Sequence, residues 1–158
     1  MIVSLQTTSR SLGLALACTL LALANEVRAA DLVLPQAKPV KLAGDFKFTE
    51  GPAVSANGDV YFTDIPNNRI HKWSASNKEL SIFAEETNGA NGLYFADDGR
   101  LFACQGNAKR VVAYSADGND TSSLAKRYDG KKFNKPNDLW IDLKGGVYFS
   151  DPNYGNKE

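Results

Sequence analysis

The sequence has little histidine or cysteine and no surplus of either charge. Lysine plus arginine and aspartate plus glutamate number 18 each, which argues against the basic surface that nucleic-acid binding requires. One histidine and two cysteines argue against a zinc site built from those residue types. The chain also lacks a Gly-x-Ser-x-Gly motif, so nothing in it supports a Ser-His-Asp hydrolase. We therefore expect no nucleic-acid partner.

Long hydrophobic runs are missing as well. The 13 residues of Leu12–Ala24 are too few to span a bilayer, which needs about 20. Arg10 precedes this stretch, and Val27-Arg28-Ala29 offers small residues at the −3 and −1 positions. The pattern predicts a signal peptide at residues 1–29 and export to the periplasm or the extracellular space, with no stable membrane span. Lipoprotein attachment at Cys18 is a rival interpretation, but Ala15-Leu16-Ala17 lacks the usual leading leucine.

Removal of residues 1–29 leaves Cys104 as the single cysteine. One cysteine cannot form an internal disulfide, so stability must come from the core or from a metal. The preceding Leu101-Phe102-Ala103 predicts that Cys104 is a buried strand thiol and not a nucleophile. His71 lies within a repeated strand where its counterpart is Val112, which favours a surface or interstrand role over catalysis.

The remaining sequence is repetitive. Three similar strands each follow a tight turn, and the turn glycines Gly58, Gly99 and Gly145 are spaced by 41 and 46 residues. Asn-Gly and Asp-Gly are strong hairpin signals because both residues accept positive φ. The three strands are Val60-Tyr61-Phe62-Thr63-Asp64, Leu101-Phe102-Ala103-Cys104-Gln105 and Val147-Tyr148-Phe149-Ser150-Asp151.

Further strands complete the repeat. Arg69–Ser74 matches Arg110–Ser115, and a fourth strand follows at Leu80–Ala84 and, less cleanly, at Ser122–Tyr128. Four antiparallel strands in 41 to 46 residues are typical of a β-propeller blade, and the connections are too short for helices. We predict an all-β partial propeller over residues 30–158. Its blade units cover about 50–90, 91–136 and a truncated 137–158.

One position of the repeat carries oxygen donors. Glu50, Asn91 and Asn137 each stand eight residues before a turn glycine, at the entrance to the first strand of a blade. The first strand of a blade is innermost, so these side chains should converge at one mouth of the central channel. One carboxylate and several amide oxygens suit a hard cation such as Ca²⁺. The alternative is that these residues only form turns.

Three motifs together resemble the gluconolactonase and senescence-marker-protein (regucalcin) family. The resemblance runs from about Phe48 to Gly155, and family members are six-bladed propellers that hold a divalent cation and hydrolyse sugar lactones. The motifs are Phe48-Thr49-Glu50-Gly51-Pro52, Asn91-Gly92-Leu93 with Asp98-Gly99-Arg100-Leu101, and Lys135-Pro136-Asn137-Asp138-Leu139 followed by Gly146-Val147-Tyr148-Phe149-Ser150-Asp151-Pro152.

The resemblance implies roles for five residues. Glu50 and Asn137 match metal ligands, and the cation is Ca²⁺ or another divalent ion such as Zn²⁺, Mg²⁺ or Mn²⁺. Lys135 stands where some relatives place a substrate-contacting arginine, and Asp138 matches an acidic neighbour that faces the substrate. Asn91 lines the same mouth without being a usual direct ligand, and we group it with the substrate-binding residues. The family's later Asn and Asp ligands, the Asp being the proposed general base, have no counterpart here.

The function expected from the resemblance is hydrolysis of a gluconolactone-like sugar lactone. Six blades would need roughly 246 to 276 residues, and 109 remain counting Glu50 itself, so we expect a fragment of a longer protein that is inactive alone. Val40–Phe46 reads as a strand without a local partner, of the kind that completes a last blade. Alternatives are a non-catalytic propeller that binds a partner, or a phosphotriesterase or other esterase on the same scaffold. The basic residues Lys126, Arg127, Lys131, Lys132 and Lys135 are interpreted as a solvated loop, with steering of an anionic substrate as the alternative.

Overall fold

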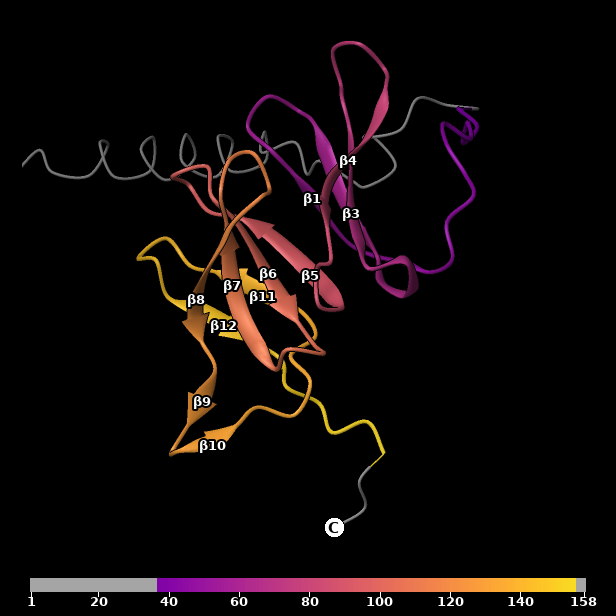
Figure 1. Cartoon of the computed structure of the whole chain (residues 1–158). Helices are drawn as coiled ribbons and strands as arrows, with labels where there is room; N and C mark the ends of the chain where they lie inside the picture. The colour runs from indigo at the N-terminus through magenta and orange to yellow at the C-terminus, as the bar shows by residue number, and fades with distance from the viewer. Residues whose placement is uncertain (1–36, 156–158) are drawn as a thin grey trace, which may run out of the picture. The chain divides into compact units, whose positions relative to one another are not determined.

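The computed structural model describes residues 37–155 and contains β-strands in two four-stranded and two two-stranded sheets (Figure 1). The all-β prediction is confirmed. The expected signal peptide at residues 1–29 lies outside the described residues. Residues 43–155 belong to one compact unit, and residues 37–42, which belong to another, are exposed and have no regular secondary structure. In the described part of the chain, no helix is long and apolar enough to cross a membrane.

The first four-stranded sheet contains β1 to β4 in sequence order, each antiparallel to the next. Gly58 has a φ of 85° in the first turn, a conformation that glycine adopts without steric cost. The register of β1 against β2 shifts between Glu50 and Ala53, so β1 bends at Gly51 and Pro52, directly after Glu50. The strands are β1 (Thr49–Val54), β2 (Val60–Asp64), β3 (Arg69–Trp73) and β4 (Leu80–Glu85).

The second sheet repeats the first in order and in irregularity. Its first strand pair shifts register between Ala90 and Leu93, which encloses Asn91 and Gly92, whereas the shift in the first sheet encloses Gly51 and Pro52. The turn glycine Gly99 has a φ of 83°. The bend at the entrance of the first strand is therefore a property of the repeat. The strands are β5 (Ala90–Phe95), β6 (Leu101–Gln105), β7 (Arg110–Tyr114) and β8 (Thr121–Ala125).

The third unit begins with the hairpin of β11 (Leu139–Ile141) and β12 (Val147–Phe149). A separate hairpin of β9 (Arg127–Tyr128) and β10 (Lys131–Lys132) extends from the end of β8 (Figure 1). The predicted strand over Ser122–Tyr128 is therefore wrong at its C-terminal end. The chain leaves the sheet after Ala125 and folds back on itself, and Asp129 and Gly130 have φ values of 53° and 75° in the turn.

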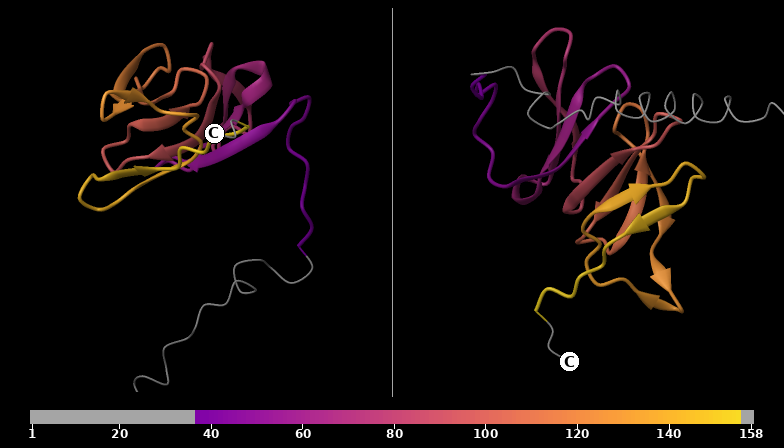
Figure 2. Two further views of the ribbon diagram at one scale, coloured as in Figure 1. Left: turned by 90° about the horizontal axis from the view of Figure 1, so that it is seen from below. Right: turned by 180° about the vertical axis from the view of Figure 1, so that it is seen from behind.

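Successive sheets lie side by side in the views of Figure 2, and an apolar layer lies between each neighbouring pair. Tyr61 and Ile70 from the first sheet pack with Leu93 and Val112 from the second, and Ile70 and Val112 have no exposed surface. Phe102 and Cys104 on the other face of the second sheet pack toward β11 and β12. Full burial of one such aliphatic side chain stabilises the fold by about 1.5–3 kcal/mol. Each sheet therefore buries its apolar face against the next.

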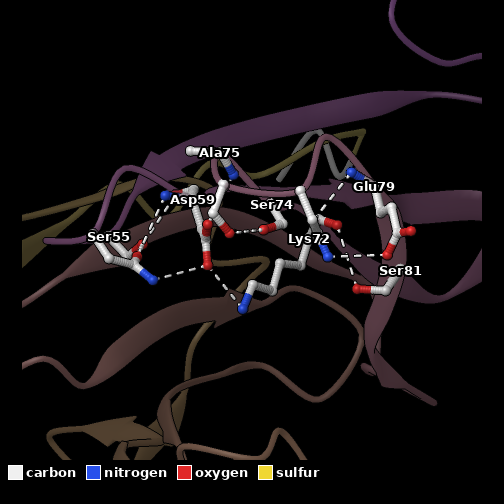
Figure 3. A network of polar contacts seen from close by, with 10 residues as sticks. Ser55, Asp59, Lys72, Ser74, Ala75, Glu79 and Ser81 are labelled. Carbon is white, nitrogen blue, oxygen red and sulfur yellow. Dashed lines mark hydrogen bonds and ion pairs between the residues drawn. The ribbon is translucent and has the colours of Figure 1, made fainter.

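A buried carboxylate joins the two turns at one end of the first sheet (Figure 3). Asp59 accepts hydrogen bonds from the Ala75 backbone N–H at 2.9 Å and from Asn57 Nδ2 at 3.0 Å, and it pairs with Lys72 Nζ at 2.8 Å. The Lys72 ammonium, the Ala75 amide and the Asn57 side chain lower the pKa of Asp59 to about 2. The same pairing raises the pKa of Lys72. This network fixes the β1–β2 turn against the β3–β4 turn.

The strand predicted over Val40–Phe46 does not form. A strand needs a neighbour to complete its hydrogen bonds, and in the described part of the chain this segment pairs with none. Phe46 instead contacts Phe62 and His71 with its ring, at centroid distances of 5.1 and 5.0 Å.

Candidate functional site

Four of the five residues predicted for the site line one hollow of about 320 Å³. They are Glu50 from β1, Asn91 from β5, and Lys135 and Asn137 from the segment before β11. The entrances of three successive innermost strands therefore meet here. The other lining residues are Phe48, Ile65, Gly89, Gly106, Asn107, Pro136 and Tyr154.

Two glycines allow the innermost strands to approach each other. A Cβ at Gly51, where φ is 50°, would lie 2.2 Å from the Asn91 carbonyl oxygen. A Cβ at Gly92 would lie 2.8 Å from the Asn137 carbonyl oxygen. Real Cβ atoms do not come this close to backbone atoms, so each position requires glycine. The residue before each glycine carries the candidate donor, so backbone contact sets the spacing between donors.

Hydrogen bonds fix the same three strand entrances to one another. The Thr63 hydroxyl, fully buried, lies 3.1 Å from the Glu50 carbonyl oxygen and 3.2 Å from the Asn91 carbonyl oxygen. The Gly92 N–H donates to the Asn137 carbonyl at 2.7 Å. Glu50, Asn91 and Asn137 are thus positioned by backbone atoms, and their side chains remain available for chemistry.

Two aspartates in equivalent positions of the repeat hold the segments that precede the candidate ligands. Asp64, at the end of β2, accepts the backbone N–H groups of Lys47 and Phe48, three and two residues before Glu50, at 3.1–3.2 Å. Asp151, after β12, accepts the N–H groups of Asn134 and Lys135 at 2.8 Å. Asn134 and Lys135 are three and two residues before Asn137, the same separations as those of Lys47 and Phe48 from Glu50. Both aspartates are positioning residues that the sequence analysis missed.

The repeat offered a signal for these two aspartates. Thr63-Asp64 and Ser150-Asp151 end equivalent strands, whereas the second unit has Cys104-Gln105 there. Gln105 makes different bonds, donating to Tyr114 Oη at 3.1 Å and accepting from Arg110 Nε at 2.7 Å. Burial by itself raises the pKa of Asp64, but donors from Phe48, Asn67 and Lys47 outweigh burial and lower it.

The Asn137 side chain is oriented by Tyr154. Its Nδ2 lies 2.9 Å from Tyr154 Oη, which leaves Oδ1 as the free acceptor of the amide. Lys135 Nζ lies 5.9 Å from the centroid of the Tyr154 ring. Tyr154 follows β12, which returns to the end of the hairpin where β11 begins. Its role could not be predicted, since no sequence motif distinguishes Tyr154 from an ordinary loop aromatic.

Asp138 is placed differently from the other four predicted residues. It does not line the hollow, and its Oδ1 lies 2.9 Å from the Leu139 backbone nitrogen and beside Gly92. The structure therefore brings Glu50, Asn91, Lys135 and Asn137 together and leaves Asp138 at the border.

Cys104 and His71 lie outside the hollow. Cys104 is fully buried, and burial, with the charges of Asp138 and Asp151, raises the pKa of its thiol to about 12. His71 is buried between Phe46 and Phe62, and burial lowers its pKa. Neither side chain offers a reactive group to the hollow.

The donor set of the hollow fits a hard cation. Among residues 37–155, no three His, Cys, Asp or Glu side chains cluster as a metal site would require. The hollow supplies one carboxylate, from Glu50, and amide oxygens from asparagine. Oxygen-only sets of this kind suit Ca²⁺ or Mg²⁺ better than Zn²⁺.

Comparison with known proteins places the chain in a family. Residues 48–158 match the family model described as SMP-30/Gluconolactonase/LRE-like region. The chain is 30% identical over 140 residues to a gluconolactonase of Zymomonas mobilis subsp. mobilis. That match covers 79% of this chain and 39% of the relative, so the chain spans about two fifths of the length of the curated relative.

Solved structures agree with the sequence match. A gluconolactonase of Xanthomonas campestris superposes with a TM-score of 0.68 at 28% identity, over 72% of this chain and 38% of that one. Regucalcin of Agrobacterium tumefaciens, a calcium-binding protein, superposes with a TM-score of 0.52 at 18% identity, over 63% and 36%, and shows the fold alone. The predicted family and the partial propeller fold are confirmed: the chain belongs to the SMP-30/gluconolactonase/LRE-like family.

Proposed function

We propose that this chain supplies one side of a divalent-cation site in an enzyme that hydrolyses a sugar lactone. The convergence of Glu50, Asn91 and Asn137 in one hollow carries the proposal. The relatives named gluconolactonase support the reaction type.

The residues of the hollow suit distinct tasks. The Glu50 carboxylate and the Asn137 Oδ1 would hold the cation, which when bound polarises a carbonyl and stabilises developing negative charge. The Lys135 ammonium attracts the carboxylate that ring opening produces, as a point charge without the bidentate fork of arginine. Asn91 donates to, or accepts from, the hydroxyl groups of the sugar. Asp138, beside Gly92 at the border of the hollow, would be a further carboxylate facing the substrate.

Calcium is the proposed cation. The donors are all oxygens, and regucalcin, which shares the fold, is a calcium-binding protein. Two protein ligands fall well short of the six to eight that Ca²⁺ takes, so the chain alone should bind it weakly, with a dissociation constant on the order of 10⁻³ M. Mg²⁺, Mn²⁺ and Zn²⁺ are the alternatives for the test below.

Calorimetric titration of the chain with CaCl₂ tests the proposal. Glu50→Gln removes the single carboxylate while keeping its size and should weaken binding at least about tenfold, since affinity follows ligand charge. Asn137→Ala should weaken binding by a smaller factor. Glu86→Gln, at an exposed residue outside the hollow, is the matched control and should bind as the unaltered chain does. Unchanged calcium affinity in Glu50→Gln would overturn the proposal.

We also propose, from residues 1–29 alone, that the protein is exported with cleavage after Ala29. Cell fractionation and N-terminal sequencing of the product test this. A product that stays in the cytoplasm with Met1 intact would contradict it.

A further inference from the structure

A second hollow, of about 280 Å³, is lined almost entirely by cations. Its lining comes from the β6–β7 turn and the start of β7, and from the segment that runs from the end of β8 into the β9–β10 hairpin. Five of its six lining residues are basic and none is acidic. They are Ala108, Lys109, Arg110, Lys126, Arg127 and Lys132.

The hairpin register explains which of its side chains enter the hollow. Arg127 pairs with Lys132, and Tyr128 pairs with Lys131. Paired residues project from the same face of a hairpin, and consecutive residues project from opposite faces. Arg127 and Lys132 therefore share the face that lines the hollow, while Tyr128 and Lys131 share the other.

The five basic side chains repel one another, and solvent screens this repulsion in part because Lys109, Lys126, Arg127 and Lys132 are exposed. Like charges directly opposite each other destabilise a strand pair, as Arg127 and Lys132 do here. Arg110 Nε donates to the neutral Gln105 Oε1 at 2.7 Å, and an Arg127 Nη donates to the Gly130 carbonyl at 2.8 Å, so neither charge is neutralised. None of the ion pairs found between residues 37 and 155 includes any of the five basic side chains.

We propose that this hollow binds the phosphate group of a small molecule, independently of the proposed lactonase function. A dianion satisfies several cations at once, whereas a single carboxylate leaves most of them uncompensated. Two guanidinium groups provide the planar fork that matches phosphate oxygens, and three ammonium groups add charge. The cations converge on one hollow of about 280 Å³ and do not form an extended stripe, which favours a small ligand over an extended polymer.

The phosphate hollow, defined by the six residues above, adjoins the candidate cation hollow. Gly106 and Asn107 line the cation hollow, and the next two residues of the same turn, Ala108 and Lys109, line the phosphate hollow. Lys109 has a φ of 56° in this turn. A phosphate bound here would therefore lie beside the cation hollow as a ligand separate from the cation.

The test is a calorimetric titration of the chain with inorganic phosphate and with pyrophosphate at low ionic strength. Lys132→Ala should weaken binding about tenfold, the effect of losing one charge-assisted hydrogen bond. Lys131→Ala removes the same charge from the opposite face of the same hairpin and should change affinity less than about twofold. Lys126 lies outside the hairpin strands, and Lys126→Ala should weaken binding as Lys132→Ala does. Weaker binding in both variants would therefore not be explained by disruption of the hairpin.

Three results would overturn the proposal. The first is absence of saturable binding by either anion at millimolar concentration. The second is an equal effect of Lys131→Ala and Lys132→Ala on phosphate binding. The third is tight binding of heparin that depends equally on both lysines, because the patch would then act as a diffuse cationic surface that binds polyanions. Glu50→Gln should leave phosphate binding unchanged, so failure of the cation site does not affect this test.

Discussion

Replacing Asp64 should loosen the segment that carries Glu50. The Asp64 side chain has no exposed surface, and its oxygens receive the backbone N–H groups of Lys47 and Phe48 and the Asn67 amide, the last at 2.7 Å. Asp64→Ala removes the acceptor for all three donors. The segment before β1 then loses its attachment to the end of β2.

The size of the effect follows from these bonds. A hydrogen bond to a charged group contributes about 1.5–3 kcal/mol, and a buried donor left unpaired costs about 1–3 kcal/mol. Lys47 and Phe48 are exposed, so water can replace part of what their N–H groups lose. We therefore expect Asp64→Ala to lower the free energy of unfolding by about 2–3 kcal/mol. Asp64→Asn keeps an acceptor oxygen and should cost about half as much.

Urea unfolding followed by circular dichroism measures the change, with Asp97→Ala as control because Asp97 is exposed in the β5–β6 turn. Calcium titration of Asp64→Asn adds a second measurement, since a mobile Glu50 should bind more weakly although it is intact. If Asp64→Ala is no less stable than Asp97→Ala, the aspartate does not hold this segment and the reasoning fails.

Four further outcomes are expected. Gly51→Ala should destabilise the chain by about 2–4 kcal/mol in thermal unfolding, through a positive φ and a clash with backbone, whereas Gly99→Ala, with open space around it, should cost about 1 kcal/mol. The pKa of Asp59 is lowered, so the stability that Asp59 contributes is present above about pH 4 and is lost toward pH 2. In Asp59→Asn, the free energy of unfolding should therefore change less with pH over that range. Burial lowers the pKa of His71, so the free energy of unfolding should fall as the pH drops below about 6.5. In His71→Phe, unfolding measured at pH 7 and at pH 5 should not show that decrease. With calcium present, the chain alone should open gluconolactone no faster than buffer, because only two protein ligands face the cation; measurable calcium-dependent turnover would contradict this.

Local patterns were sufficient to predict the repeated strands. Gly58 and Gly99 adopt the positive φ that their Asn-Gly and Asp-Gly turns predict, and each joins the first two strands of a sheet. The β9–β10 hairpin carries the same signal in Asp129-Gly130, but strands of two residues leave too little alternation to recognise. The strand prediction for Val40–Phe46 was wrong for another reason. The apolar pattern of this segment suits a strand, but a strand also needs a hydrogen-bonding neighbour, and the pattern does not show whether one is present.

The position of the candidate site could be predicted from the sequence, but the residues that hold the candidate ligands in place could not. Spacing within the repeat was enough to bring Glu50, Asn91 and Asn137 to one hollow. The contribution of Asp64 and Asp151 depends on which strand ends lie beside the segment before each candidate ligand, and that follows only from the folded sheets. Tyr154 was missed for the same reason.

At the entrances of β1 and β5, a glycine makes the position of the donor independent of its identity. Because Gly51 and Gly92 contact backbone atoms of the next strand, the frame around this side of the hollow does not rely on the side chains at 50 and 91. Those two side chains can therefore be exchanged, by evolution or by design, with little effect on the scaffold. A single frame can in this way host different cations, or none, by changing only the residue in front of each glycine.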